Sequence, residues 1–149
     1  MNLEALHLNG CNLYDEGAIN IIDSIYASSN TKIGKIFLNS NHITNKTAKL
    51  IAQMLADGNT KVKELGLKWN QITAIGGNLI AAALADNRDL KILDLGWNSI
   101  GVYPPAQRNL KKPKKLMSGM KAGEVGKVWG SALAQNKDLV HLDLSFNKI

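Results

Sequence analysis

A pattern of apolar residues and asparagine recurs five times along the 149 residues of this chain. It is clearest in the stretch VKELGLKWNQI, whose spacing is set by Val62, Leu65, Leu67, Asn70 and Ile72. A unit of this kind cannot bury its apolar face alone, so the copies must stack on one another into a solenoid. The other four copies begin at Leu3, Ile33, Leu90 and Leu139.

Each copy predicts a short strand followed by a helix. Alternating apolar residues in the strand place one side in the core and the other side outward. Residues at helical spacing, such as Ile51 and Leu55, predict the helices, and Asp86-Asn87 predicts a left-handed helix end. Parallel strands joined by helices form right-handed crossovers, so we expect an α/β horseshoe with concave strands and convex helices. The strands are predicted near residues 5–8, 35–38, 64–67, 92–95 and 141–144.

The ninth position of the pattern is asparagine in four copies and cysteine in the first. An asparagine amide can pair with N–H and C=O groups of the bending backbone, which would otherwise be buried without partners. We therefore predict a structural ladder made of Cys11, Asn41, Asn70, Asn98 and Asn147.

The fourth repeat contains an insertion. Equivalent leucines are 28 residues apart from Leu65 to Leu93 but 49 apart from Leu93 to Leu142. Alignment of the flanking helices places the extra residues at about 101–121, a stretch with all three prolines and no acidic residue. Its six basic residues equal the net charge of +6, so the rest of the chain is near neutral. The candidate binding residues here are Arg108, Lys111, Lys112, Lys114 and Lys115.

Three interpretations of this basic insertion stay open. It could be a loop without a role, an element that docks on acidic protein, nucleic acid or lipid headgroups, or extra sequence from an unusual gene model. Tyr103 alone accompanies the basic residues, so the aromatic residues expected of a single-strand nucleic-acid binder are missing. The composition therefore argues against nucleic acid and membrane as the main partners.

Several features predict a cytoplasmic, intracellular protein. One cysteine cannot form an internal disulfide, and the N-terminal MNLEALHLNG has neither the basic nor the apolar region of a signal peptide. The longest mostly apolar run, Ala74–Ala85, is too short to span a bilayer.

The pattern L-x-x-L-x-L-x-x-N/C-x-L, with a helix and a period of 28 to 30 residues, resembles the leucine-rich repeat family. It is most similar to the ribonuclease-inhibitor-like class, which includes NOD-like receptors, the activator of the Ran GTPase and the tropomodulins. The resemblance implies an intracellular protein that binds another protein. It does not choose the partner, because function depends on the site.

Outward residues of equivalent strands should form columns on the concave face. The column before the ladder asparagine reads Gly10, Ser40, Trp69, Trp97, Phe146, so three consecutive repeats carry aromatic rings. The rings could pack on one another or anchor a partner, as exposed aromatic residues do at interfaces. We favour anchors, because the column is similar to the ligand-facing aromatic positions of ribonuclease inhibitor. The third tryptophan, Trp129, is predicted to be buried.

A second column brings Asp94 beside Asp143, with His141 on the same strand. Carboxylates near an imidazole are typical of acid–base or metal chemistry. An open, shallow surface without an activated nucleophile instead favours a place for a partner's arginine or lysine. We expect no catalytic residue, no metal site, no cofactor and no small-molecule substrate.

The sequence thus predicts one non-enzymatic leucine-rich repeat domain over residues 1–149, which binds another protein on its concave face. The alternatives are a regulator of a small GTPase of the Ran-activator type, or recruitment to nucleic acid or acidic surfaces through the basic insertion. The uncapped ends favour a fragment of a longer array or self-association. The predicted partner-binding residues are Trp69, Trp97, Phe146, Phe37, Lys35, Glu64, Lys68, Asp94, His141 and Asp143.

Overall fold

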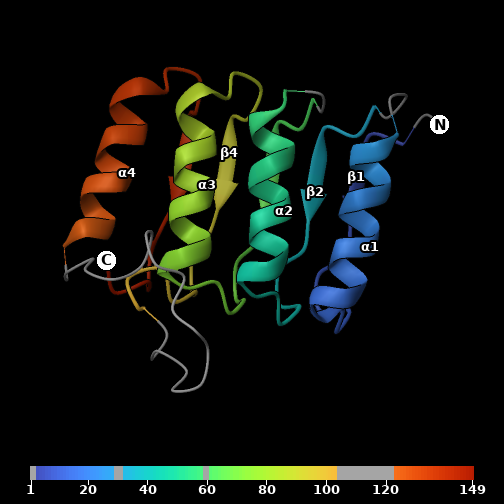
Figure 1. The fold of residues 1–149 in the computed structure, drawn as a ribbon. Helices are drawn as coiled ribbons and strands as arrows, with labels where there is room; N and C mark the ends of the chain where they lie inside the picture. The colour runs from blue at the N-terminus through green and yellow to red at the C-terminus, as the bar shows by residue number, and fades with distance from the viewer. Residues whose placement is uncertain (1–2, 29–31, 59–60, 104–122) are drawn as a thin grey trace, which may run out of the picture.

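The computed structural model describes residues 3–28, 32–58, 61–103 and 123–149. Strands alternate with helices along these residues in the order that the repeat predicts (Figure 1). The strands are β1 (Ala5–His7), β2 (Lys35–Phe37), β3 (Glu64–Gly66), β4 (Ile92–Asp94) and β5 (His141–Asp143). The helices are α1 (Tyr14–Ala27), α2 (Asn45–Ala56), α3 (Ala74–Asp86) and α4 (Glu124–Gln135).

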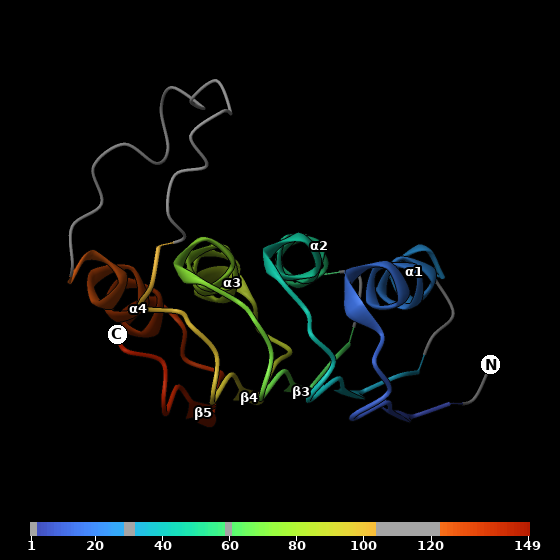
Figure 2. The same cartoon turned by 90° about the horizontal axis from the view of Figure 1, so that it is seen from below.

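The five strands form one parallel sheet in the order β1-β2-β3-β4-β5. Equivalent leucine-type residues pair across it, for example Ile36 with Leu65 and Leu65 with Leu93. Figure 2 shows the strands in one layer and the helices in a second layer on one side of the sheet. The predicted α/β solenoid is therefore confirmed, with strands on the concave side and helices on the convex side.

Each strand ends one residue earlier than predicted. The predicted last residue still belongs to the ladder of backbone hydrogen bonds, because the Leu38 N–H donates to the Gly66 carbonyl at 2.8 Å. The strands are short because the chain turns directly after this leucine toward the helix layer.

The hydrophobic core lies between the sheet and the helices. Ile36, Leu65 and Leu93 point into it from the strands, and all three are at most 1% exposed. Ile51 and Ile80 reach it from the helices and are fully buried. Each such side chain contributes about 1.5–3 kcal/mol by leaving water. This hydrophobic core runs through all repeats without a break, as the stacking of repeats requires.

The asparagine ladder is present and connects consecutive repeats. The side-chain oxygen of Asn70 accepts hydrogen bonds from the backbone N–H groups of Asn41 at 3.0 Å and Ile43 at 2.9 Å, in the preceding repeat. Its amide nitrogen donates to the carbonyl oxygens of Leu38 at 3.1 Å and Leu67 at 2.9 Å. The side chain therefore satisfies four buried backbone groups from two repeats.

A second pair of asparagines, at the ends of the last two helices, was not predicted for this role. The backbone of Asn87 is extended, so the expected left-handed helix end at Asp86-Asn87 is wrong. The Asn87 side chain instead donates to the Leu55 carbonyl at 2.8 Å and accepts the N–H groups of Asp89 and Leu90. Asn136 makes the equivalent bonds to the repeat before it.

A side chain from one repeat also caps the helix of the next. The Asp15 carboxylate, at the start of α1, accepts hydrogen bonds from the backbone N–H and hydroxyl groups of Thr44 and Thr47, which open α2. Burial would raise the pKa of Asp15, but these hydrogen bonds outweigh it and hold the pKa below its usual value. Asn45 caps α3 in the same way, since its side-chain oxygen accepts from the N–H groups of Thr73 and Gly76.

The first three residues of the predicted insertion belong to the repeat. The Gly101 N–H donates to the Asn147 carbonyl at 2.8 Å, and a Cβ on Gly101 would lie 1.8 Å from the Lys148 carbonyl oxygen. This close approach admits glycine only. Tyr103 packs against the core. The rest of the predicted insertion, including its five candidate basic residues, lies outside the described residues.

Asn70→Ala should lower the free energy of unfolding by about 2–4 kcal/mol, because it leaves several buried N–H and C=O groups without partners. The neighbouring exposed Gln71→Ala provides the control and should change stability by less than about 0.5 kcal/mol. Urea denaturation of both variants measures the difference. Equal stability of the two variants would contradict a structural role for the ladder.

Asp15→Ala should lower the free energy of unfolding by about 1–2 kcal/mol at neutral pH, because Thr44 and Thr47 lose their acceptor. The folded pKa of Asp15 is lowered, so its contribution is present above the unfolded pKa of about 3.9 and is lost as the pH falls through the folded pKa. Denaturation curves at neutral and strongly acidic pH should show the effect shrinking. Asp23→Ala, on the same helix, serves as the exposed control.

Candidate functional site

The face of the sheet that the helices do not cover carries most of the predicted binding residues. We call it the open face (Figure 2). Its two strand columns contain the residues that alternate with the buried leucines. The first column reads Ala5, Lys35, Glu64, Ile92, His141, and the second reads His7, Phe37, Gly66, Asp94, Asp143.

Trp69, Trp97 and Phe146 form a continuous stack beside this face, which we call the aromatic ridge. The ring centroids of Trp69 and Trp97 are 4.2 Å apart, with 9° between the ring planes. Those of Trp97 and Phe146 are 3.9 Å apart, with 17° between the planes. The three side chains are nevertheless 52%, 38% and 65% exposed, respectively. The rings thus pack on one another and remain accessible, which combines the two interpretations that the sequence left open.

The backbone at the ridge adopts a conformation that side chains usually avoid. The φ angles are +57° at Trp69, +55° at Trp97 and +58° at Phe146. The equivalent Gly10 and Ser40 have φ of +66° and +57°, so the turn after every strand requires this left-handed residue. Such a backbone costs roughly 1–2 kcal/mol in any residue with a Cβ. Bulky rings occupy it where glycine would be the least costly choice.

Stacking determines which part of each ring a partner can meet. Trp97 is covered on both faces by Trp69 and Phe146, so it presents its edge to solvent. The negative charge of a π system lies over its faces and not at its edge. The side of the ridge therefore offers an apolar strip to a partner and no face to a cation at Trp97.

Two carboxylates lie next to each other on the last two strands. Asp94 pairs in register with Asp143, and each accepts the N–H of a residue two positions further on, Gly96 at 2.9 Å and Ser145 at 2.8 Å. Hydrogen bonds from the Ser145 side chain and backbone hold the pKa of Asp143 below its usual value, against the effect of burial. The positive charges of Lys68 and His141 lower it further. Asp143 is thus a carboxylate at neutral pH.

Two of the predicted charged residues bind each other. The Lys35 ammonium lies 2.6 Å from the Glu64 carboxylate on the next strand. A surface pair of this kind contributes about 0–1 kcal/mol, so it is available to be broken by a partner. Lys68 is placed by the Asn39 side chain, whose oxygen accepts the Lys68 N–H at 2.8 Å.

The structure adds one apolar residue that the sequence reasoning missed. Ile92 is exposed and lies in the column of Lys35 and Glu64. Its place in that column, opposite Glu64, is the sequence signal for its exposure. Phe37 stacks on His7, with ring centroids 4.6 Å apart, and so stands separately from the aromatic ridge.

Predicted structural residues divide into two groups. Asn41, Asn70, Asn98 and Asn147 are buried, whereas Cys11 is exposed and its thiol contacts the Asn9 carbonyl instead of a neighbouring repeat. The Cys11 side chain therefore does not connect two repeats by hydrogen bonds, as the asparagine side chains do. Trp129 is buried among the core residues of α4, as predicted.

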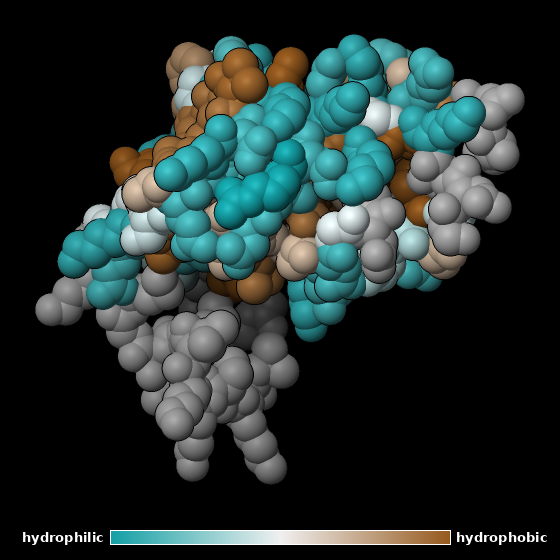
Figure 3. All heavy atoms as spheres, turned by 90° about the horizontal axis from the view of Figure 1, so that it is seen from above, coloured by the Kyte–Doolittle hydropathy of each residue, from teal (hydrophilic) through white to brown (hydrophobic). Residues whose placement is uncertain are grey.

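The exposed apolar surface is concentrated in the second half of the chain. Of the large apolar side chains that the structure finds exposed, only Leu3 and Tyr14 lie before Trp69. Figure 3, which views the molecule from above, shows an apolar (brown) area next to a broad hydrophilic (teal) one. Over the residues described, no group of three His, Cys, Asp or Glu side chains could hold a metal ion, and no helix is long and apolar enough to cross a membrane.

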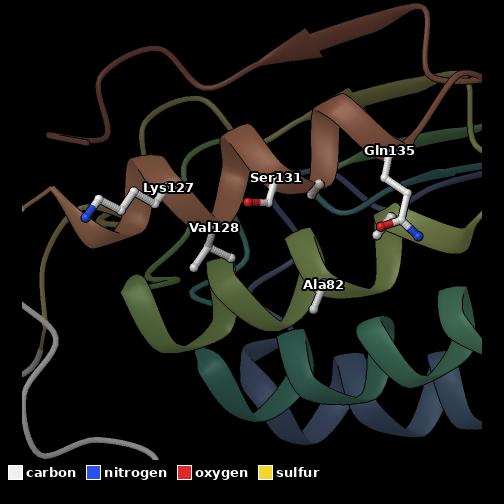
Figure 4. Close-up of a pocket in the computed structure, with 7 residues that line it drawn as sticks. Ala82, Lys127, Val128, Ser131 and Gln135 are labelled. Carbon is white, nitrogen blue, oxygen red and sulfur yellow. The ribbon is translucent and has the colours of Figure 1, made fainter.

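A groove of about 440 Å³ lies between α3 and α4 on the convex side (Figure 4). Small or apolar side chains line most of it, including Ala82, Val128 and Ala132, and Ser131 and Gln135 add polar atoms. Lys127 is its one ionisable side chain among the described lining residues. This set offers no nucleophile with a base and no pair of acids.

Replacement of Trp97 tests the left-handed backbone. Trp97→Gly relieves a strain of about 1 kcal/mol while losing the ring contacts. Trp97→Ala loses the same contacts and keeps the strain, so it should be about 1 kcal/mol less stable than Trp97→Gly. This order reverses the usual one, and urea denaturation measures it. A more stable alanine variant would contradict the assigned conformation.

Comparisons with known proteins agree with this geometry. A family model described as Leucine Rich repeat matches residues 1–21, 58–81, 86–102 and 135–149, together more than half of the chain. A solved structure described as Leiomodin-1 Actin-Binding Site 2 is similar with a TM-score of 0.69 and 21% identity, over 93% of this chain and 68% of that one. At this identity the likeness concerns the fold alone. No curated protein matches the chain. The chain belongs to the leucine-rich repeat family.

Proposed function

We propose that this chain is a protein-interaction module that binds another protein on its concave face. The aromatic ridge carries the proposal. Three consecutive repeats place a ring in a left-handed turn that the fold builds equally well with Gly10 or Ser40. The rings are exposed, so burial in the chain's own core does not explain them. Contact with a partner does, because buried aromatic side chains dominate the binding energy of protein interfaces.

The surface around the ridge has the mixed character of an interface. Ile92 adds apolar area, and Lys35, Glu64, Lys68, Asp94, His141 and Asp143 add charges of both signs. Five strands spaced about 4.8 Å apart extend over about 19 Å, so one partner can contact side chains from several repeats at once. The ridge would be its apolar centre and the charges would set orientation and specificity.

We also propose that the chain is not an enzyme. On the open face of the sheet, His141 is exposed and the two paired carboxylates are half-buried. Acid–base catalysis gains its strength in enclosed sites that exclude water. The same residues suit electrostatic complementarity with a partner.

Two alternatives make different predictions. A regulator of a small GTPase, of the kind that the Ran activator represents, would change the rate of GTP hydrolysis, whereas a binding module leaves it unchanged. Recruitment through the basic insertion at about 101–121 would be lost when those residues are deleted and would weaken steeply with salt. The leiomodin fragment is described as actin-binding, so actin is one defined protein to include among the candidates.

The double variant Trp69→Ala with Trp97→Ala should weaken partner binding by about 2 kcal/mol or more, which is roughly a 30-fold rise in Kd. Quantitative mass spectrometry of proteins captured by wild type and variant identifies candidates, and Kd is then measured with each purified candidate. Leu133→Ala, an exposed apolar replacement on convex α4, is the matched control and should bind as wild type does. Circular dichroism must show all three chains folded. An unchanged Kd for the folded double variant would refute the concave-face proposal.

A further inference from the structure

We infer that the open face takes a partner segment in which an arginine lies within a few residues of an apolar side chain. This inference rests on the proposed function and specifies the chemistry of the partner. It follows from three features of repeats three to five. Two carboxylates converge there, no ion pair of the described residues involves either of them, and the apolar edge of the aromatic ridge lies beside them.

Gly96 brings the two carboxylates together. A Cβ placed on Gly96 would lie 3.2 Å from Asp94 Oδ1, 3.2 Å from Asp143 Oδ2 and 3.2 Å from the Ser145 hydroxyl. The two carboxylate oxygens are therefore separated by at most twice that distance. Gly96 itself is buried, so the two carboxylates come from neighbouring strands and meet directly over this turn, where Gly96 places no side chain between them.

No ion pair of the described residues involves Asp94 or Asp143, although Lys68 and His141 lie near enough to lower the pKa of Asp143. The ion pairs found there join Lys35 with Glu64, Lys61 with Asp89, and Arg88 and Lys91 with Asp138. The Gly96 N–H donates to one oxygen of Asp94, and Asp143 accepts hydrogen bonds from both the N–H and the hydroxyl of Ser145. Two adjacent carboxylates with free acceptor capacity attract a cation from outside.

Arginine fits this arrangement better than lysine. Its guanidinium is planar and carries several N–H donors in a fixed fork, which can reach two separate carboxylates at once. A lysine ammonium is a compact charge that serves one acceptor well and is more strongly hydrated. Because the acceptors are two carboxylates on adjacent strands, we expect them to prefer the guanidinium of arginine to the ammonium of lysine.

The aromatic ridge supplies the second half of the recognition. Trp97 follows Asp94 by three residues, so their Cα atoms are at most about 10 Å apart. In an extended partner, residues i and i+2 point to the same side and are about 7 Å apart. An arginine over Gly96 can thus have an apolar neighbour against the edge of Trp97, which stacking has left as an apolar strip.

The test uses the full chain and two synthetic peptides, acetyl-Leu-Ser-Arg-Ser-Leu-amide and the same peptide with citrulline in place of arginine. Citrulline keeps the shape and loses the charge. NMR titration should show saturable shifts at the side-chain carboxyl carbons of Asp94 and Asp143 and at the Trp97 indole. The Kd of the citrulline peptide should be at least about 10-fold higher, as expected when a charge-assisted bond is lost.

The double variant Asp94→Asn with Asp143→Asn should lose the preference for arginine, while Asp23→Asn on exposed α1 should keep it. Asparagine retains an oxygen for the N–H groups of Gly96 and Ser145, so the turns stay formed. The inference is overturned if the two peptides bind equally, if neither gives a saturable shift, or if the double variant binds the arginine peptide like wild type. If these peptide results fail while the Trp69 and Trp97 replacements still weaken protein binding, the concave face binds a partner of another chemistry.

Discussion

One asparagine side chain in each of repeats two to five connects the turns of consecutive repeats. Each of Asn41, Asn70, Asn98 and Asn147 bonds backbone groups in its own turn and in the turn before it. Without these bonds, the polar backbone of the turns would be buried unpaired beside the core. Because the amide has one length, neighbouring turns repeat with one spacing. That spacing aligns the rings of the aromatic ridge and brings Asp94 beside Asp143, so the surface inherits its geometry from the turns.

The fold was predictable because its determinants are periodic. Apolar spacing identified strands, helices and the order of the sheet, and the burial of Ile36, Ile51 and Trp129 agrees with that reading. Columns on the open face could also be listed in advance, since a parallel sheet in register places equivalent residues side by side. The function of those columns stays a proposal, because repetition determines where a residue stands and not what it binds.

Features that depend on the backbone conformation could not be predicted from the sequence. The left-handed turn has one glycine signal, Gly10, and four residues that ordinarily argue against it, among them Trp69 and Phe146. Asn87 resembled a helix stop and is instead a bridge to Leu55, because its extended backbone frees the side chain to reach the previous repeat. The pairing of Lys35 with Glu64 required the register of two specific strands, and the apolar Ile92 stood out only once its exposure was known.

The turn before each ladder asparagine tolerates Gly10, Ser40, Trp97 and Phe146 with nearly the same backbone angles. The hydrogen bonds of the asparagine side chains set the backbone of this turn. The side chain at the position before the asparagine is free to vary, so it can change what the surface binds without changing the fold. A lineage or an engineer could exchange one ring for another, or for none, and alter the choice of partner without rebuilding the solenoid. The side chain at this position can therefore change while the turn keeps its backbone conformation.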